Sequence, residues 1–184
     1  MEKIKMFCAA SLVVAAIFLM PSVGWTQPKP ETNAPVIVNA FAVDKGQFGV
    51  TLKIYLEADD PDGNMLKIVT AVDQVGYGRY PADIIFLKPQ YRKHFKGYIQ
   101  WNTFSKNTSY LKEWNEITIR VSVVDMAGNE SKDAVFPFTF ESGVTNPDLA
   151  KLPPPFADGN NVKLGNVVID LYEPTTMGAG DRSD

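Results

Sequence analysis

The stretch FGVTLKIYLEA, residues 48–58, decides the fold class of this chain. Apolar side chains alternate along it with polar or small ones, and the alternation holds for eleven residues. A period of two predicts a β-strand with one face on a core and the other face in water. The residues expected on the core face are Phe48, Val50, Leu52, Ile54, Leu56 and Ala58.

Two later stretches repeat this pattern, ITIRVSVVD (117–125) and VFPFTF (135–140). Pro137 has no N–H to donate to a ladder, so the second stretch is expected at the edge of a sheet. Weaker strand patterns cover residues 35–44, 65–73, 82–88 and 95–102. Seven short strands separated by turn-rich loops predict an all-β protein, an antiparallel sandwich with a barrel as the alternative.

The joins between strands carry a resemblance to a known family. They are the turn EADDPDGNML (57–66) and the hairpin VVDMAGNES (123–131), where Gly128 suits a positive φ angle. Both resemble corners of bacterial immunoglobulin-like domains, which are exported β-sandwiches of PKD-like and cadherin-like type. The resemblance spans residues 35–141 and implies an immunoglobulin-like antiparallel β-sandwich of about seven strands, with flexible N- and C-terminal arms.

The first 24 residues have the pattern of a secretory signal peptide. Lys3 and Lys5 precede an apolar run over residues 7–20, and Ser22 and Gly24 suit a cleavage site. The run is shorter than the roughly 20 residues that span a bilayer, so cleavage is expected to leave no stable membrane insertion. Cleavage would remove Cys8, the only cysteine, and change the net charge from −3 to −4. The expected location is secreted or periplasmic.

The remaining segments organise the chain around the sandwich. Residues 25–34 are expected to form an extended leader, residues 142–163 a linker rich in proline and asparagine, and residues 174–184 a disordered tail. LGNVVIDLYE, residues 164–173, is an isolated strand candidate. It either folds back onto the sandwich or docks on another protein by strand addition. The docking alternative assigns partner contacts to Val167, Ile169 and Leu171.

The acidic turn raises the question of a metal site. An EF-hand is excluded, because the loop register would place Ala58 and Val69 where oxygen ligands are required. A looser Ca²⁺ site remains a hypothesis, since the two loops are expected at the same end of the sandwich. The alternative is a simple turn whose charge nearby basic side chains neutralise. The candidate ligands are Asp59, Asp60, Asp62, Asp125 and Asn129.

Aromatic and basic residues between positions 77 and 102 suggest a second candidate surface. Aromatic planes stack on sugars, and basic groups bind anions. The alternative is that these rings mostly cover the core. The candidate ligand-binding residues are Tyr77, Tyr80, Tyr91, Arg92, Tyr98 and Trp101.

Few residues suggest catalysis or nucleic-acid binding. His94 is the only histidine, and the mild negative charge does not suit a nucleic acid. No cofactor is expected unless the acidic loops hold Ca²⁺. The main hypothesis is an exported, non-enzymatic binding or accessory module whose partner is another exported protein, in a cell-envelope or extracellular assembly. The alternatives are a calcium- or carbohydrate-binding module and, third, a hydrolase.

Overall fold

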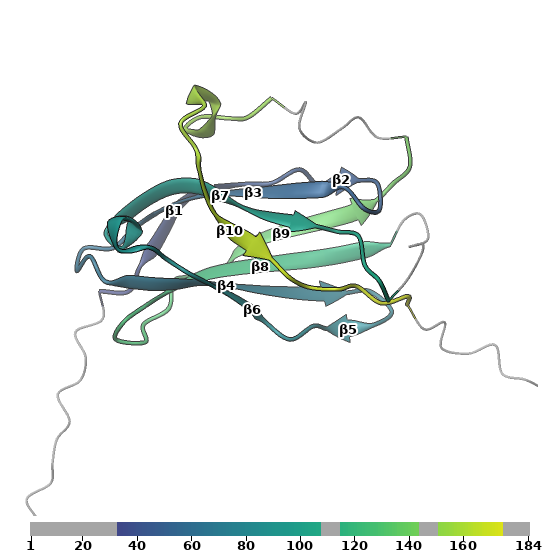
Figure 1. Ribbon diagram of the computed structural model, residues 1–184, viewed down its shortest axis with the longest axis horizontal. Helices are drawn as coiled ribbons and strands as arrows, with labels where there is room; N and C mark the ends of the chain where they lie inside the picture. Colours follow the sequence, from purple (N-terminus) through teal and green to yellow (C-terminus); the bar gives the residue numbers. More distant parts are fainter. Residues whose placement is uncertain (1–32, 108–114, 144–150, 175–184) are drawn as a thin grey trace, which may run out of the picture. The chain divides into compact units, whose positions relative to one another are not determined.

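The computed structural model describes residues 33–107, 115–143 and 151–174. Two β-sheets pack face to face as an immunoglobulin-like sandwich (Figure 1). The predicted signal peptide lies outside the described residues, as do most of the predicted leader and the chain beyond residue 174. Within the described part of the chain, no helix has the length and apolar character needed to cross a bilayer.

All seven predicted strands of the sandwich are present, and β10 covers the first part of the isolated strand predicted at residues 164–173. Among the described residues, the patterns did not predict the two-residue strands β2 and β5. The first sheet, sheet A, has the order β1 (Val36–Phe41), β3 (Thr51–Asp59), β7 (His94–Asn102) and β10 (Val162–Val167). Sheet B has the order β2 (Lys45–Gly46), β9 (Ala134–Phe140), β8 (Glu116–Asp125), β4 (Met65–Gln74) and β5 (Gly78–Arg79), and β6 (Asp83–Phe86) also pairs with β4. In the described parts of the connections lie the 3-10 helices η1 (Pro89–Tyr91) and η3 (Phe156–Asp158).

The core follows the predicted alternation. In β3 the side chains of Leu52, Ile54, Leu56 and Ala58 are fully buried, while Lys53 and the residues between the others stay partly exposed. The β8 residues at odd positions 117–123 and the three phenylalanines of β9 complete this core. Most strand pairs are antiparallel, but β10 runs parallel to β7 and β2 runs parallel to β9.

The segment 151–174, which we call the C-terminal arm, packs on the sandwich. Its Phe156 is buried against Tyr55 on the outer face of sheet A, with ring centroids 5.6 Å apart. Lys96 of β7 forms an ion pair with Asp158 beside it. Residues 151–161, part of the stretch predicted as a linker rich in proline and asparagine, therefore pack on the outer face of sheet A, which offers Phe156 an aromatic surface.

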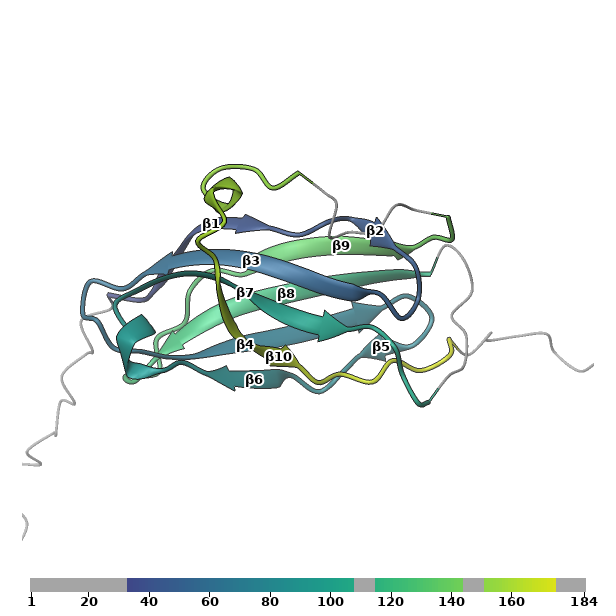
Figure 2. The same cartoon turned by 45° about the horizontal axis from the view of Figure 1, so that its top comes forward.

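Beyond η3 the arm runs beside β7 towards β5 and closes one flank of the sandwich (Figures 1 and 2). Val167, Ile169 and Leu171 are buried, with exposed fractions of 5%, 7% and 0%. The fold-back alternative therefore describes this segment. Its three apolar side chains belong to the core of their own domain and are not a docking surface for a partner.

Side chains of the sandwich bind the backbone of this closing segment. Trp101 Nε1 donates to the carbonyl oxygen of Ile169 (3.0 Å), and Ser105 Oγ donates to that of Leu171 (2.6 Å). Satisfying these carbonyls matters because an unpaired buried polar group costs about 1–3 kcal/mol. The arm thus completes the fold at this flank.

Candidate functional site

The opposite flank, between β1 and β9, contains a groove. Its volume is about 830 Å³, within the roughly 300–1,000 Å³ typical of ligand-binding clefts. One wall is the strand β1 with the residues before it, and the other wall is the connection that leads into β9. The lining residues are 33–40, Pro61 and 130–134.

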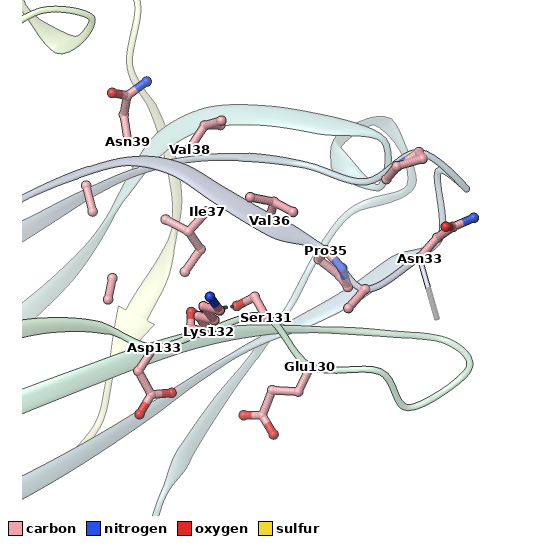
Figure 3. A pocket seen from close by; sticks show the side chains of 14 residues that line it. Asn33, Pro35, Val36, Ile37, Val38, Asn39, Glu130, Ser131, Lys132 and Asp133 are labelled. Carbon is pink, nitrogen blue, oxygen red and sulfur yellow. Dashed lines mark hydrogen bonds between the residues drawn. The ribbon is translucent and has the colours of Figure 1, made fainter. Parts of the chain in front are cut away.

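The side chains of β1 divide between the groove and the outer surface (Figure 3). Ile37 points from β1 towards the facing wall, whereas Val36, Val38 and Asn39 point to the other side. Val38 and Asn39 follow one another on one side because a β-bulge interrupts the pairing with β3 between Ile37 and Asn39. Val36 and Val38 are 53% and 50% exposed, so the outer side of this edge is also apolar.

The free edge of β1 presents backbone groups to the groove. The N–H of Asp60 donates to Lys93 O (2.9 Å), and the N–H of Thr103 donates to Val50 O (3.0 Å). Even-numbered residues of β3 therefore direct their backbone groups to β7, and odd-numbered ones direct theirs to β1.

The register of β1 then fixes which of its backbone groups remain free. Asn39 pairs with Glu57, an odd-numbered residue, so its backbone groups face β3. Ile37 and Ala40 pair with even-numbered residues, so their backbone groups face the groove. Among the described residues, no backbone hydrogen bond outside the strand ladders involves Ile37 or Ala40.

The other side of the groove is less suited to pairing with a strand. Pro137 lies in β9, opposite Thr118 of β8, and offers no N–H to an additional strand. The short strand β2 already covers Thr139 and Phe140. The expected edge position of β9 is confirmed apart from this two-residue strand, and β1 is the edge with donors to offer.

The acidic turn between β3 and β4 is stabilised by its own carboxylate. Asp60 is buried, with 1% of its surface exposed. Its two carboxylate oxygens accept the backbone N–H groups of Asp62 (2.9 Å) and Asn64 (3.1 Å). Gly63 has φ +68°, the left-handed conformation that this turn requires. The residues ADDPDGN therefore form a tight turn.

The other predicted calcium ligands also have separate partners. Asp125 accepts the backbone N–H of Asn129 (2.7 Å) and its side-chain amide (2.8 Å). Asp59 lies 2.8 Å from His94 Nδ1 at an exposed strand end, and Asp62 accepts a bond from Asn33 (3.1 Å). Nowhere in the described ranges do three or more His, Cys, Asp or Glu side chains group as metal ligands. The structure therefore does not assemble the five predicted residues into a calcium site.

The predicted aromatic surface is divided among different parts of the sandwich. Tyr77 and Tyr80 stack at the β4–β5 turn, with centroids 4.6 Å apart. Trp101 is buried in the core. Tyr98 lies on the outer face of sheet A, 5.6 Å from Tyr55. The six residues therefore do not form one ligand-binding face.

The two remaining members of that set lie near the acidic turn. Tyr91, in η1, is partly buried against the core. Arg92 donates from Nη1 towards Met126 Sδ (3.8 Å), and its backbone carbonyl accepts the N–H of Met65. Arg92 therefore supports the start of β4 after the acidic turn.

Comparisons with known proteins add a distant structural likeness. No family model matches the sequence, and no curated protein matches it. The chain is similar to a solved structure, the PKD domain of an M14-like peptidase from Thermoplasmatales archaeon SCGC AB-540-F20. The TM-score is 0.39 and the identity 17%, over 59% of this chain and 97% of that one. An identity this low transfers no functional residue.

Proposed function

We propose that this chain is an exported, non-catalytic domain that binds another protein by accepting an extended segment of it along β1. The observation that carries the proposal is the free edge of β1, where the backbone groups of Ile37 and Ala40 face the groove. Main-chain hydrogen bonds to a sheet edge provide affinity in strand addition, and pockets for alternate side chains provide specificity. Export is expected from the pattern of residues 1–24.

The sequence of β1 lacks two of the usual protections of an edge strand. Val36–Phe41 contains no charged residue and no proline. Natural sheet edges commonly carry lysine, proline or an inward-pointing charge, which prevent pairing with other chains. The bulge at Val38 protects part of the edge, but it leaves the backbone groups of Ile37 and Ala40 on the free side.

The groove defines the kind of segment that fits. An added strand would continue sheet A beyond β1, and its side chains would alternate between two surroundings. One set would enter the groove beside Ile37, and the other set would lie beside Val36 and Val38. The partner segment is therefore extended, about five or six residues long, and apolar at most positions.

A proline substitution tests this function without cutting the existing ladder. Twelve-residue peptides selected by display on the purified protein would serve as the probe, and calorimetry would measure their affinity. Ala40→Pro removes a donor from the free edge only. It is expected to weaken peptide binding at least about tenfold, since one hydrogen bond contributes about 0.5–1.5 kcal/mol and the ring also blocks the added strand.

The control for this experiment lies one residue earlier. Asn39→Pro removes a donor that faces β3, so it should lower the stability of the domain, whereas Ala40→Pro should melt close to the wild type. Phe86→Ser, on β6 of sheet B, should bind the selected peptides normally. Peptides that bind Ala40→Pro as tightly as the wild type, or a selection that enriches none, would overturn the proposal.

A further inference from the structure

Three tyrosines meet where the arm ends against sheet B. The ring of Tyr77 stacks on Tyr80 (centroids 4.6 Å apart, planes at 18°) and on Tyr172 (5.2 Å, 2°). Tyr80 and Tyr172 are 6.4 Å apart and also nearly parallel. The patterns in the sequence pointed to Tyr77 and Tyr80 but not to Tyr172, which comes from the other end of the chain.

The three centroid distances show which face of Tyr77 the other two tyrosines cover. Atoms of stacked rings lie about 3.5–4 Å apart, so rings on opposite faces of Tyr77 would be separated by about 7 Å or more. The observed 6.4 Å is shorter. Tyr80 and Tyr172 therefore lie side by side under the same face of Tyr77. The other face of Tyr77 is outward, in agreement with its 44% exposed surface.

A buried hydrogen-bond network fixes the layer beneath Tyr77. The Tyr80 hydroxyl donates to Gln74 Oε1 (2.5 Å) and accepts the backbone N–H of Tyr172 (2.8 Å). Gln74 Nε2 donates to the Tyr172 carbonyl oxygen (2.9 Å). Burial raises the pKa of Tyr80 to about 12, so this hydroxyl stays protonated and keeps its donor role at neutral pH. Tyr77 is thus held flat on a rigid support.

The two arginines near this surface are already paired with one carboxylate. Arg79, two residues after Tyr77, donates through Nε and Nη2 to the two oxygens of Asp73, at 2.7 and 3.0 Å. Arg120 Nε also bonds Asp73 (3.3 Å). An anionic ligand group would have to compete with Asp73 for these arginines. A neutral ligand that stacks on a ring and forms hydrogen bonds around its rim would not.

We propose that Tyr77 is the stacking platform of a binding site for a neutral, β-linked polysaccharide. In pyranoses whose substituents are all equatorial, such as glucose and N-acetylglucosamine, axial C–H groups give each face of the ring a flat apolar surface. Such a face stacks on an aromatic plane, and the hydroxyl groups around the sugar are available to the phenol hydroxyls of Tyr77 and Tyr172. The site lies on the sheet B side of the closed flank, is separate from the β1 groove, and does not depend on the function proposed for it.

Titration calorimetry of the purified protein with cellohexaose and with chitohexaose tests the proposal. At least one hexasaccharide is expected to bind. Tyr77→Ala should weaken that binding about tenfold, since aromatic stacking contributes about 0.5–1.5 kcal/mol. Tyr77→Phe keeps the platform and should stay within about threefold of the wild type.

The matched control is another exposed aromatic residue, Phe86, which is 68% exposed on β6. Phe86→Ala should leave saccharide binding unchanged. Tyr77→Trp keeps an aromatic plane and should bind the saccharide at least as tightly as the wild type. This result would show that the loss in Tyr77→Ala comes from lost stacking and not from misfolding. Absence of binding to both sugars at millimolar concentration overturns the proposal. So does equal binding by Tyr77→Ala, or an equal loss in Phe86→Ala.

Discussion

Each flank of the sandwich has a sheet edge whose backbone groups need hydrogen-bond partners, and the two flanks differ in how these groups are covered. At the closed flank, the C-terminal arm buries Leu171 and its neighbours, and sandwich side chains such as Trp101 bind its backbone. At the open flank, β1 leaves the backbone groups of Ile37 and Ala40 facing a groove. Unpaired edges invite an additional chain. The protein provides that chain itself at one flank, and we infer that a partner provides it at the other.

The burial of the arm at the closed flank also explains why its apolar residues do not dock on another protein. Its alternating side chains resemble a docking peptide in sequence, and they do dock, but on their own domain. The backbone N–H of Val168 donates to Asp83 Oδ2 (2.8 Å), and Asp83 belongs to β6 of the other sheet. The arm therefore joins the two sheets at one flank. The groove between β1 and β9 lies at the opposite flank.

The largest expected effect is the removal of the arm strand. Deleting residues 162–184 exposes the core that Val167, Ile169 and Leu171 cover. Each such side chain contributes about 1.5–3 kcal/mol when buried, so the loss approaches the typical 5–15 kcal/mol total stability of a domain. The truncated protein should show no cooperative thermal transition near that of the wild type. An unchanged midpoint by circular dichroism would show that the closed flank needs no covering.

The next largest effect is the expected difference in stability between two single substitutions, one at each flank. Leu171→Ala, at the closed flank, is expected to cost about 2–5 kcal/mol of unfolding free energy, as do other large-to-small core substitutions. Val38→Ala, at the open flank, removes a half-exposed side chain and should cost less than about 0.5 kcal/mol. Urea denaturation measures both. Equal losses would mean that the open flank is packed as well as the closed one.

The smallest expected effect concerns the ion pair that fastens η3. The Lys96 ammonium, bonded to the Asp158 carboxylate, lowers the pKa of Asp158 below its usual 3.8. A lowered pKa stabilises the folded state above pH 3.8, and this contribution is lost as the pH falls through the folded-state pKa. The melting midpoint of the wild type should exceed that of Asp158→Asn at pH 6, and the gap should narrow by pH 2.5. A gap that stays constant would show that the pair does not help to hold the arm.

The predictions from sequence were least accurate for sites that need several side chains from distant parts of the chain to lie together. Asp60 and Asp125 are well-placed oxygen donors in the sequence, but each is occupied by the turn in which it lies. Turn formation within four residues needs no distant partner, so each of these carboxylates is oriented towards N–H groups of its own loop. The tyrosines fail as one surface for a different reason. The chain passes from sheet B to sheet A between β6 and β7, so Tyr77 and Tyr98 lie on different parts of the sandwich.

The groove was missed because its signal in the sequence is weak. PVIVNAFAVD is a poor alternating pattern, since the bulge at Val38 breaks the period of two. The lack of charge between Val36 and Phe41 is the feature that marks an unprotected edge. That feature becomes informative only when the strand is known to lie at an edge.

The sequence by itself determined the seven main strands, their core-facing residues and the edge position of Pro137. These properties depend on the period of two and on the missing N–H of proline, which are local. Tertiary structure alone decided the course of the arm, the open side of β1 and the meeting of Tyr77 with Tyr172. Those features depend on which strands become neighbours, and a side-chain pattern of period two is the same whichever strand lies alongside.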